Sequence, residues 1–106
     1  MNVSEMTTER DRCKAAALAA ADSIRTTPNM PDYHRIRLVG LVSTYADCVD
    51  ALNVGIAGGA NATRDPLLDA AKAALIDFEN RSTGNQYIPA ASLDQVRGYA
   101  RAAKLA

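Results

Sequence analysis

The sequence predicts an all-α protein, a small Ala-rich four-helix bundle with up-and-down topology and a long central second helix. Apolar residues between Tyr33 and Ile56 recur at steps of three and four, the spacing that lines one face of a helix. About a fifth of the 106 residues are Ala, the strongest helix former. Short or moderate connections containing Pro or Gly separate the helical segments, which favours antiparallel neighbours.

The predicted second helix, residues 32–56, carries the widest apolar face. Its main line of large side chains follows the helical spacing and comprises Leu38, Val42, Tyr45, Val49, Leu52 and Ile56. The face widens to roughly half the circumference with Val39, Leu41, Ala46 and Cys48. We therefore expect this helix to contact at least two others. The opposite side is too polar to bury and is expected to face solvent: Arg37, Ser43, Thr44, Asp47 and Asp50.

The first helix is predicted over about residues 8–26. Thr7 or Thr8 can cap it, and Glu9 is placed to favour the positive end of the helix dipole. The predicted buried line comprises Met6, Cys13, Ala17, Ala20 and Ile24. Leu18 points away from this line, either as an isolated exposed residue or as part of a second contact surface.

The third helix is predicted over about residues 66–81, because Asp65 supplies a cap and Pro66 suits the first helical position. Gly84 can terminate it. Its apolar face is predicted to contain Leu67, Ala71, Ala74, Leu75 and Phe78. Ile76 projects among charged residues and has no evident place in the core.

The last helix is predicted over about residues 93–104, after a capping box that runs from Ser92 to Gln95. The loop before it is polar, and its Tyr87 and Ile88 are expected to fold over one end of the bundle.

Length and charge constrain the domain and its partners. A chain of 106 residues fits a single domain, here residues 1–106, with one modest core. Twelve basic and twelve acidic residues cancel, so no protein-wide field favours nucleic acid or acidic membranes. Residues 38–80 are nevertheless acidic and residues 81–106 basic. We expect the basic last helix to lie against the acidic middle of its own or a neighbouring chain, with phosphate binding as the alternative.

Cysteine use and targeting signals predict a soluble cytoplasmic protein. Cys13 and Cys48 lie in apolar helical faces and form no disulfide or metal pattern. The sequence has no apolar run of about 18 residues, and its N-terminal segment does not resemble a signal peptide.

No catalytic or metal-binding motif is present in the sequence. His34 is the only histidine, and no helical neighbour could orient its ring for acid–base chemistry. The glycines from Gly55 to Gly59 lack the lysine and the preceding strand of a phosphate-binding loop, so they indicate a hinge. We therefore predict no enzyme activity, no metal and no cofactor.

The leading hypothesis is a protein–protein interaction module, expected to be a homodimer. Tyr and Arg are frequent among residues that dominate interface energies. The candidate anchors are Leu18, Tyr33, Arg35, Arg37 and Ile76. Short, Ala-rich, motif-free helical chains are frequent among phage and mobile-element accessory proteins, which often bind and block a host protein. That class is a base-rate expectation carried by no particular residue.

Two alternatives stay open. The last helix exposes a basic ridge of Arg97, Arg101 and Lys104 that could contact nucleic acid, together with Arg35 and Arg37. A small-ligand pocket inside the bundle is the third possibility. It would require a closed cavity in which His34 or Tyr45 meets a second polar group.

Overall fold

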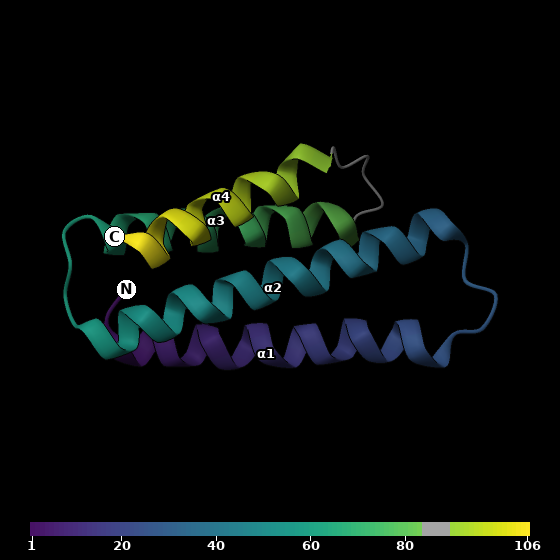
Figure 1. The fold of residues 1–106 in the computed structure, drawn as a ribbon, viewed down its shortest axis with the longest axis horizontal. Coiled ribbons are helices and arrows are strands. Elements are labelled where there is room, and N and C mark those ends of the chain that lie inside the picture. The colour runs from purple at the N-terminus through teal and green to yellow at the C-terminus, as the bar shows by residue number, and fades with distance from the viewer. Residues whose placement is uncertain (84–89) are drawn as a thin grey trace.

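The protein is a four-helix up-and-down bundle without strands in its described part (Figure 1). The computed structural model describes residues 1–83 and 90–106. The four helices are α1 (Val3–Thr26), α2 (Asp32–Gly58), α3 (Arg64–Thr83) and α4 (Ala90–Leu105), and successive helices run in opposite directions. The predicted fold class is confirmed.

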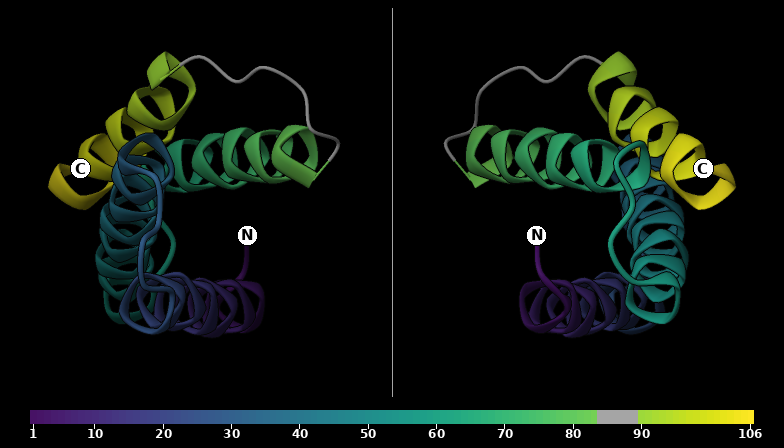
Figure 2. Two further views of the ribbon diagram at one scale, coloured as in Figure 1. Left: turned by 90° about the vertical axis from the view of Figure 1, so that its right-hand side faces the viewer. Right: turned by 90° about the vertical axis from the view of Figure 1, so that its left-hand side faces the viewer.

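Helix α2 is the centre of the arrangement, because it packs against each of the other three helices. Between the described parts of α1 and α3 or α4, no pair of Cα atoms comes within 8 Å. Viewed along the long axis, α1 and α3 extend from α2 towards the same side, one at the bottom and one at the top of the view, and α4 lies against the outer side of α2 (Figure 2). Side chains bridge α1 to α3, including a bidentate contact of Arg12 Nη1 with the Glu79 carboxylate at 2.9 and 3.0 Å.

The core consists mostly of small and medium side chains, as the Ala-rich sequence predicts. Its buried cluster comprises Met6, Cys13, Tyr45, Cys48, Ala51, Leu52, Leu68, Leu75, Val96, Ala100 and Ala103. The buried face of α2 is rotated relative to the predicted one. Thr44, expected to face solvent, is fully buried and donates a hydrogen bond to the Gly40 carbonyl at 2.8 Å. This bond allows a hydroxyl to be buried at little cost, whereas Val39, predicted to be buried, is more than half exposed.

Two helices begin earlier than the sequence predicted, because asparagine provides the cap in each case. The Asn2 side chain accepts from the Glu5 backbone amide at 2.8 Å, so α1 starts at Val3 and includes Thr7 and Thr8. Asn61 Oδ1 accepts from the backbone amides of Thr63 and Arg64 at 2.9 and 2.6 Å, which places the start of α3 before Pro66.

Of the remaining helix ends, the end of α1 at Thr26 and the start of α2 at Asp32 match the prediction, and the others extend beyond it. Helix α2 continues to Gly58 and α3 to Thr83, and α4 begins at Ala90, so Ser92 lies inside α4 and is not its cap. The predicted terminator Gly84, and the predicted packing of Tyr87 and Ile88, lie outside the described residues.

A buried arginine secures the carboxyl ends of two helices. Arg64 is nearly inaccessible to solvent, and its Nη2 approaches the Ala106 carbonyl oxygen at 3.4 Å, just beyond the end of α4. A Cβ atom added to Gly58, the last residue of α2, would lie 2.6 Å from Arg64 Nη1. A cation at this position favours both helices, because the carboxyl end of a helix carries partial negative charge.

The pair formed by α1 and α2 divides into two halves of different character. We call residues 3–13 and 44–58 the proximal half, and residues 14–26 and 32–43 the distal half. Every fully buried residue of the two helices lies in the proximal half, and none lies in the distal half. Helices α1 and α3 diverge towards the distal end, which faces the viewer in the left view of Figure 2. Only α2 therefore covers α1 there.

Candidate protein-binding surface

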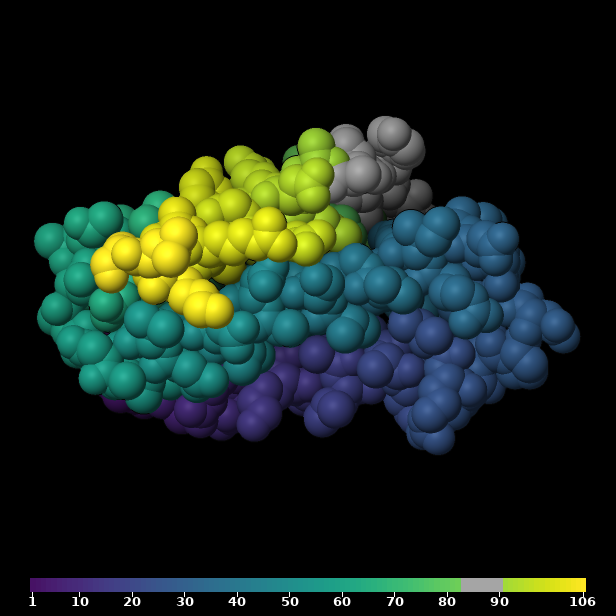
Figure 3. Space-filling view, in the orientation of Figure 1, coloured from purple at the N-terminus to yellow at the C-terminus, as the bar shows by residue number. Residues whose placement is uncertain are grey.

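The seam between α1 and α2 opens into a shallow apolar groove that lies mainly in the distal half and reaches Ala46, Val49 and Asp50 of the proximal half. Two adjacent hollows form it. The first is lined by Lys14, Ala17, Leu18, Ala46, Val49 and Asp50. The second is lined by Ala21, Ile24, Arg25, Val39, Val42 and Ser43. We call these twelve residues the distal groove. Figure 3 shows one face of the molecule, on which α1 (purple to blue) and α2 (blue to teal) lie side by side along this seam.

The helical repeat of the sequence produces this groove. On each helix the lining residues are spaced by one or three positions, so that they form one continuous stripe. The stripes meet across the seam because α1 and α2 are antiparallel and joined by a short loop. Most of the lining residues are Ala, Val, Leu or Ile, and the wall is therefore largely apolar.

Large apolar side chains in the groove are exposed to solvent. Leu18 is 70% exposed and Val39 is 54% exposed. Ile36 and Tyr33, one and two turns towards the start of α2, are also exposed. Burying a Leu, Val or Ile side chain typically contributes about 1.5–3 kcal/mol. A partner that buried these side chains would therefore gain a similar free energy of binding for each of them.

The proximal part of the same seam is closed by polar contacts. Arg10 Nη1 donates to Asn53 Oδ1 at 3.2 Å, bridging α1 to α2 one turn beyond the groove. Lys14 and Asp50 mark the end of the groove on that side, and Arg25 lies at the other end. The apolar surface is thus bounded by charges of both signs.

The five predicted anchors are not brought together. Leu18 lies in the distal groove, whereas Ile76, which is 38% exposed, lies on α3 and does not line it. Tyr33 is exposed at the start of α2 and Arg35 is half-buried. The Arg37 guanidinium donates to Ser82 Oγ and stands 5.9 Å from the Phe78 ring centroid, so Arg37 already contacts its own chain.

Six groove residues were predicted to belong to buried apolar faces instead: Ala17, Ile24, Val39, Val42, Ala46 and Val49. Their apolar character placed them there, on the expectation that the bundle would cover α2 along its whole length. The signal that could have revealed them is helix length. Helix α2 has 27 residues and α4 only 16, so α4 cannot shield all of α2.

The basic ridge on α4 pairs with acidic residues on α2. Arg97 and Arg101 each approach Asp47 Oδ2, at 3.3 and 3.4 Å, and Lys104 Nζ lies 3.7 Å from Asp50. The prediction that the basic last helix lies against the acidic middle of the chain is confirmed, and the contact is within one chain. These pairs reduce the positive potential that the ridge could offer to phosphate groups.

A second polar cluster, which the sequence did not predict, lies between α1, α2 and α3. Glu9 is only 6% exposed, and its carboxylate receives two hydrogen bonds from Arg12, at 2.6 and 3.0 Å. The Tyr45 hydroxyl donates to Glu79 at 2.6 Å. Burial, reinforced by this hydrogen bond, raises the pKa of Tyr45. Glu9 lies between Met6 and Cys13 on the buried stripe of α1, and this spacing was the available signal.

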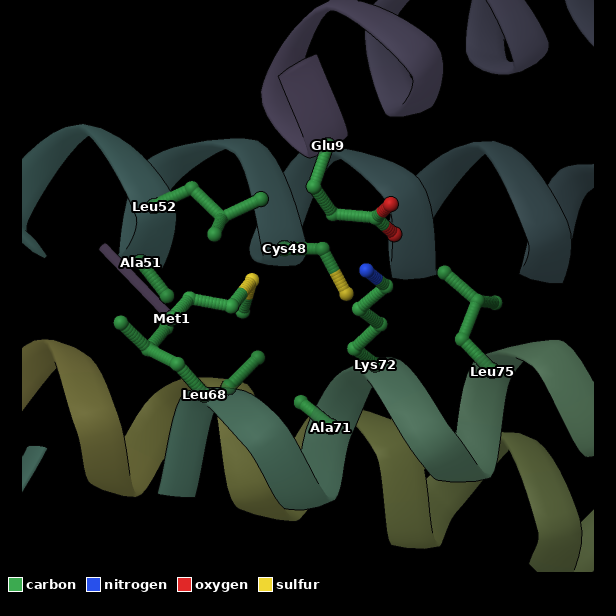
Figure 4. A pocket seen from close by; sticks show the side chains of 10 residues that line it. Met1, Glu9, Cys48, Ala51, Leu52, Leu68, Ala71, Lys72 and Leu75 are labelled. Carbon is green, nitrogen blue, oxygen red and sulfur yellow. The ribbon is translucent and has the colours of Figure 1, made fainter. Parts of the chain in front are cut away.

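The cavity beside this cluster is small. Its volume of about 10 Å³ leaves room for about one water molecule. In Figure 4 the side chains of Glu9 and Lys72 point towards one another across it, above Ala71 and Leu68. His34 and Tyr45 do not line it, and the His34 side chain is exposed. This cavity therefore does not match the small-ligand site considered from the sequence.

Both cysteines are buried and free. Burial raises the pKa of Cys48 to about 12 and also raises the pKa of Cys13, with the nearby Glu9 carboxylate contributing in each case. Both thiols are therefore protonated near neutral pH, which suppresses nucleophilic reactivity. Within residues 1–83 and 90–106, no group of three or more His, Cys, Asp or Glu side chains is arranged to hold a metal ion.

Comparisons with family models, with curated proteins and with solved structures each gave no match. Among the helices described, none combines the length and the hydropathy needed to cross a membrane.

Proposed function

We propose that this protein is a non-enzymatic protein-binding module and that the distal groove is its contact surface. The observation that carries the proposal is the continuous apolar lining of the groove, in which Leu18 and Val39 are both more than half exposed. Apolar residues scattered singly over a surface are normal, but a contiguous apolar surface with a polar rim is typical of an interaction site.

The shape of the groove suits a helical partner. A groove between two antiparallel helices accepts a further amphipathic helix, whose apolar residues at steps of three and four would enter the hollows. Helix α2 is the single neighbour of α1 in the distal half, so an added helix would provide α1 with a second neighbour, as α3 and α4 provide further neighbours to α2 in the proximal half.

We further propose that the protein acts in the cytoplasm and that binding itself is its activity, as in accessory proteins that block a target. The pairing of Arg97, Arg101 and Lys104 with Asp47 and Asp50 supports a protein partner over nucleic acid, because the cations of the ridge already have counter-charges.

Affinity capture from an extract of the native source, with quantitative mass spectrometry, tests the proposal. The double variant Leu18→Gln/Val39→Gln makes the groove polar. The matched control Val3→Gln/Ile76→Gln changes exposed apolar residues outside it. We expect the groove variant to lose at least about tenfold of the specifically captured protein, because each apolar side chain buried by the partner contributes a sizeable share of the binding energy.

The control variant should capture that protein at the wild-type level. Equal capture by the wild type and the groove variant would overturn the proposal. Circular dichroism of both variants establishes that the helices are intact.

A further inference from the structure

We propose that the occupant of the distal groove is a second copy of this chain, related by a two-fold axis that runs parallel to the groove. This inference rests on the proposed function, because it assumes that the groove is a binding surface. It adds the identity of the partner and the orientation in which it binds.

The two walls of the groove are complementary to each other. The contact of Arg10 with Asn53 fixes the register of the antiparallel helices α1 and α2. In the first hollow, this register brings the large Leu18 of α1 to about the level of the small Ala46 of α2, and Lys14 to about the level of Asp50. A two-fold axis parallel to the groove preserves these levels and places α1 of each copy on α2 of the other. Leu18 then meets Ala46 of the partner subunit, and Lys14 meets Asp50 of the partner subunit.

The charges at the two ends of the groove select this axis. A two-fold axis perpendicular to the helices would exchange the ends, so that α1 lies on α1 and Lys14 approaches Arg25 of the partner subunit. The positive charges of Lys14 and Arg25 would then face each other at both ends of the interface, because the two-fold axis repeats each contact. The parallel axis instead forms two pairs of opposite charge, Lys14 with Asp50 of the partner subunit and the reverse.

The size of the groove implies a weak dimer. About twelve residues on each helix extend over about 18 Å, and two helices side by side are about 20 Å wide. The interface would bury on the order of 800 Å² in total, below the roughly 1,200–2,000 Å² of most stable complexes. We therefore expect a dissociation constant on the order of 100 µM.

Sedimentation equilibrium of charge variants tests the geometry. We expect Lys14→Glu to weaken self-association at least about fivefold. In a dimer of this variant, the new carboxylate of each copy would face Asp50 of the partner subunit, so that two repulsive pairs form. Asp50→Lys should weaken it similarly. A one-to-one mixture of the two variants restores both opposite-charge pairs in a heterodimer, so the mixture should associate at least as tightly as the wild type.

Asp50 also contacts Lys104 within its own chain, at 3.7 Å. Lys104→Gln is therefore the control for that contact and should leave self-association unchanged. A mixture that associates no better than its separate components would overturn the inference. A wild type that stays monomeric at about 500 µM, well above the expected dissociation constant, would also overturn it. The proposed function would survive either result if Leu18→Gln/Val39→Gln still abolished capture of a different protein.

Discussion

The two halves of the pair formed by α1 and α2 have similar composition but different surroundings. In the proximal half, Leu52 and Cys13 belong to a buried cluster that includes residues of α3 and α4, and Arg12 bridges α1 to α3. In the distal half the two helices have mainly each other, and Leu18 and Val39 face solvent. The same kind of helix is therefore buried in the core at one end and leaves apolar side chains exposed at the other. Whether a leucine of α1 or α2 is buried or exposed depends on whether α3 and α4 cover that part of the helix.

The largest expected effect comes from truncating one leucine in each half. Leu52→Ala removes a side chain that is 3% exposed, and should lower the free energy of unfolding by about 2–5 kcal/mol. Leu18→Ala should change it by no more than about 0.5 kcal/mol. Urea denaturation followed by circular dichroism measures both. Similar losses for the two variants would show that the distal half is as well packed as the proximal half.

Alkaline pH should act selectively on the proximal half, which contains both thiols and Tyr45. An unfolded Cys48 ionises near pH 9, whereas the folded thiol has a pKa of about 12. The unfolded state therefore binds fewer protons above pH 9, and stability is lost as pH rises from about 9 to 12. We expect a loss of about 2–4 kcal/mol from this group and its neighbours.

Urea midpoints measured between about pH 8 and pH 11 check this expectation. Cys48→Ala should make the decline with pH shallower, because it removes one of the titrating groups. An equally steep decline in this variant would contradict the assignment.

Two glycines provide a smaller test with opposite signs. A Cβ atom added to Gly55 in the proximal half would lie 2.9 Å from Leu68 Cδ1 and 3.0 Å from Met6 Sδ. Gly55→Ala should therefore destabilise the protein by about 1–3 kcal/mol. At Gly40 in the distal half, the nearest contact would be Leu93 Cδ1 at an ordinary 3.5 Å. Gly40→Ala should stabilise the helix by up to about 1 kcal/mol.

Thermal melting of the two variants checks the signs of these effects. If both melting temperatures were higher than that of the wild type, or both were lower, the contrast between the proximal and distal halves would be refuted at these sites.

The sequence predicted the four helices and the central role of α2, because apolar spacing and the proline and glycine positions are local signals. It did not predict the rotation of α2 that buries Thr44 and exposes Val39. That rotation depends on where α1 and α4 come to lie, which no local pattern records. Among the site residues, Leu18 was identified because it stands apart from the buried line of its own helix.

The helix starts and the buried carboxylate show a different kind of error. Asn2 and Asn61 cap their helices although Thr7, Thr8 and Asp65 were equally suitable by residue type. Capping preferences overlap, and the choice depends on how far tertiary packing extends the helix. Glu9 was interpreted as a residue of the first turn. Once α1 begins at Val3, the same residue lies on the buried face.

The Arg12 cluster also determines the axial register of α1. The Ala-rich run from Ala15 to Ala21 is interrupted only by Leu18, which is exposed. Its buried side therefore presents nearly the same surface after a shift of one turn, and apolar packing alone discriminates weakly between alternative positions along the helix axis. Arg12 contacts Glu9 within α1 itself, whatever the position of the helix, but it reaches Glu79 on α3 in only one of those positions. A displacement of one turn, about 5.4 Å, would break the contact between Arg12 and Glu79. This ion pair therefore favours one axial position that packing of alanine alone would not select.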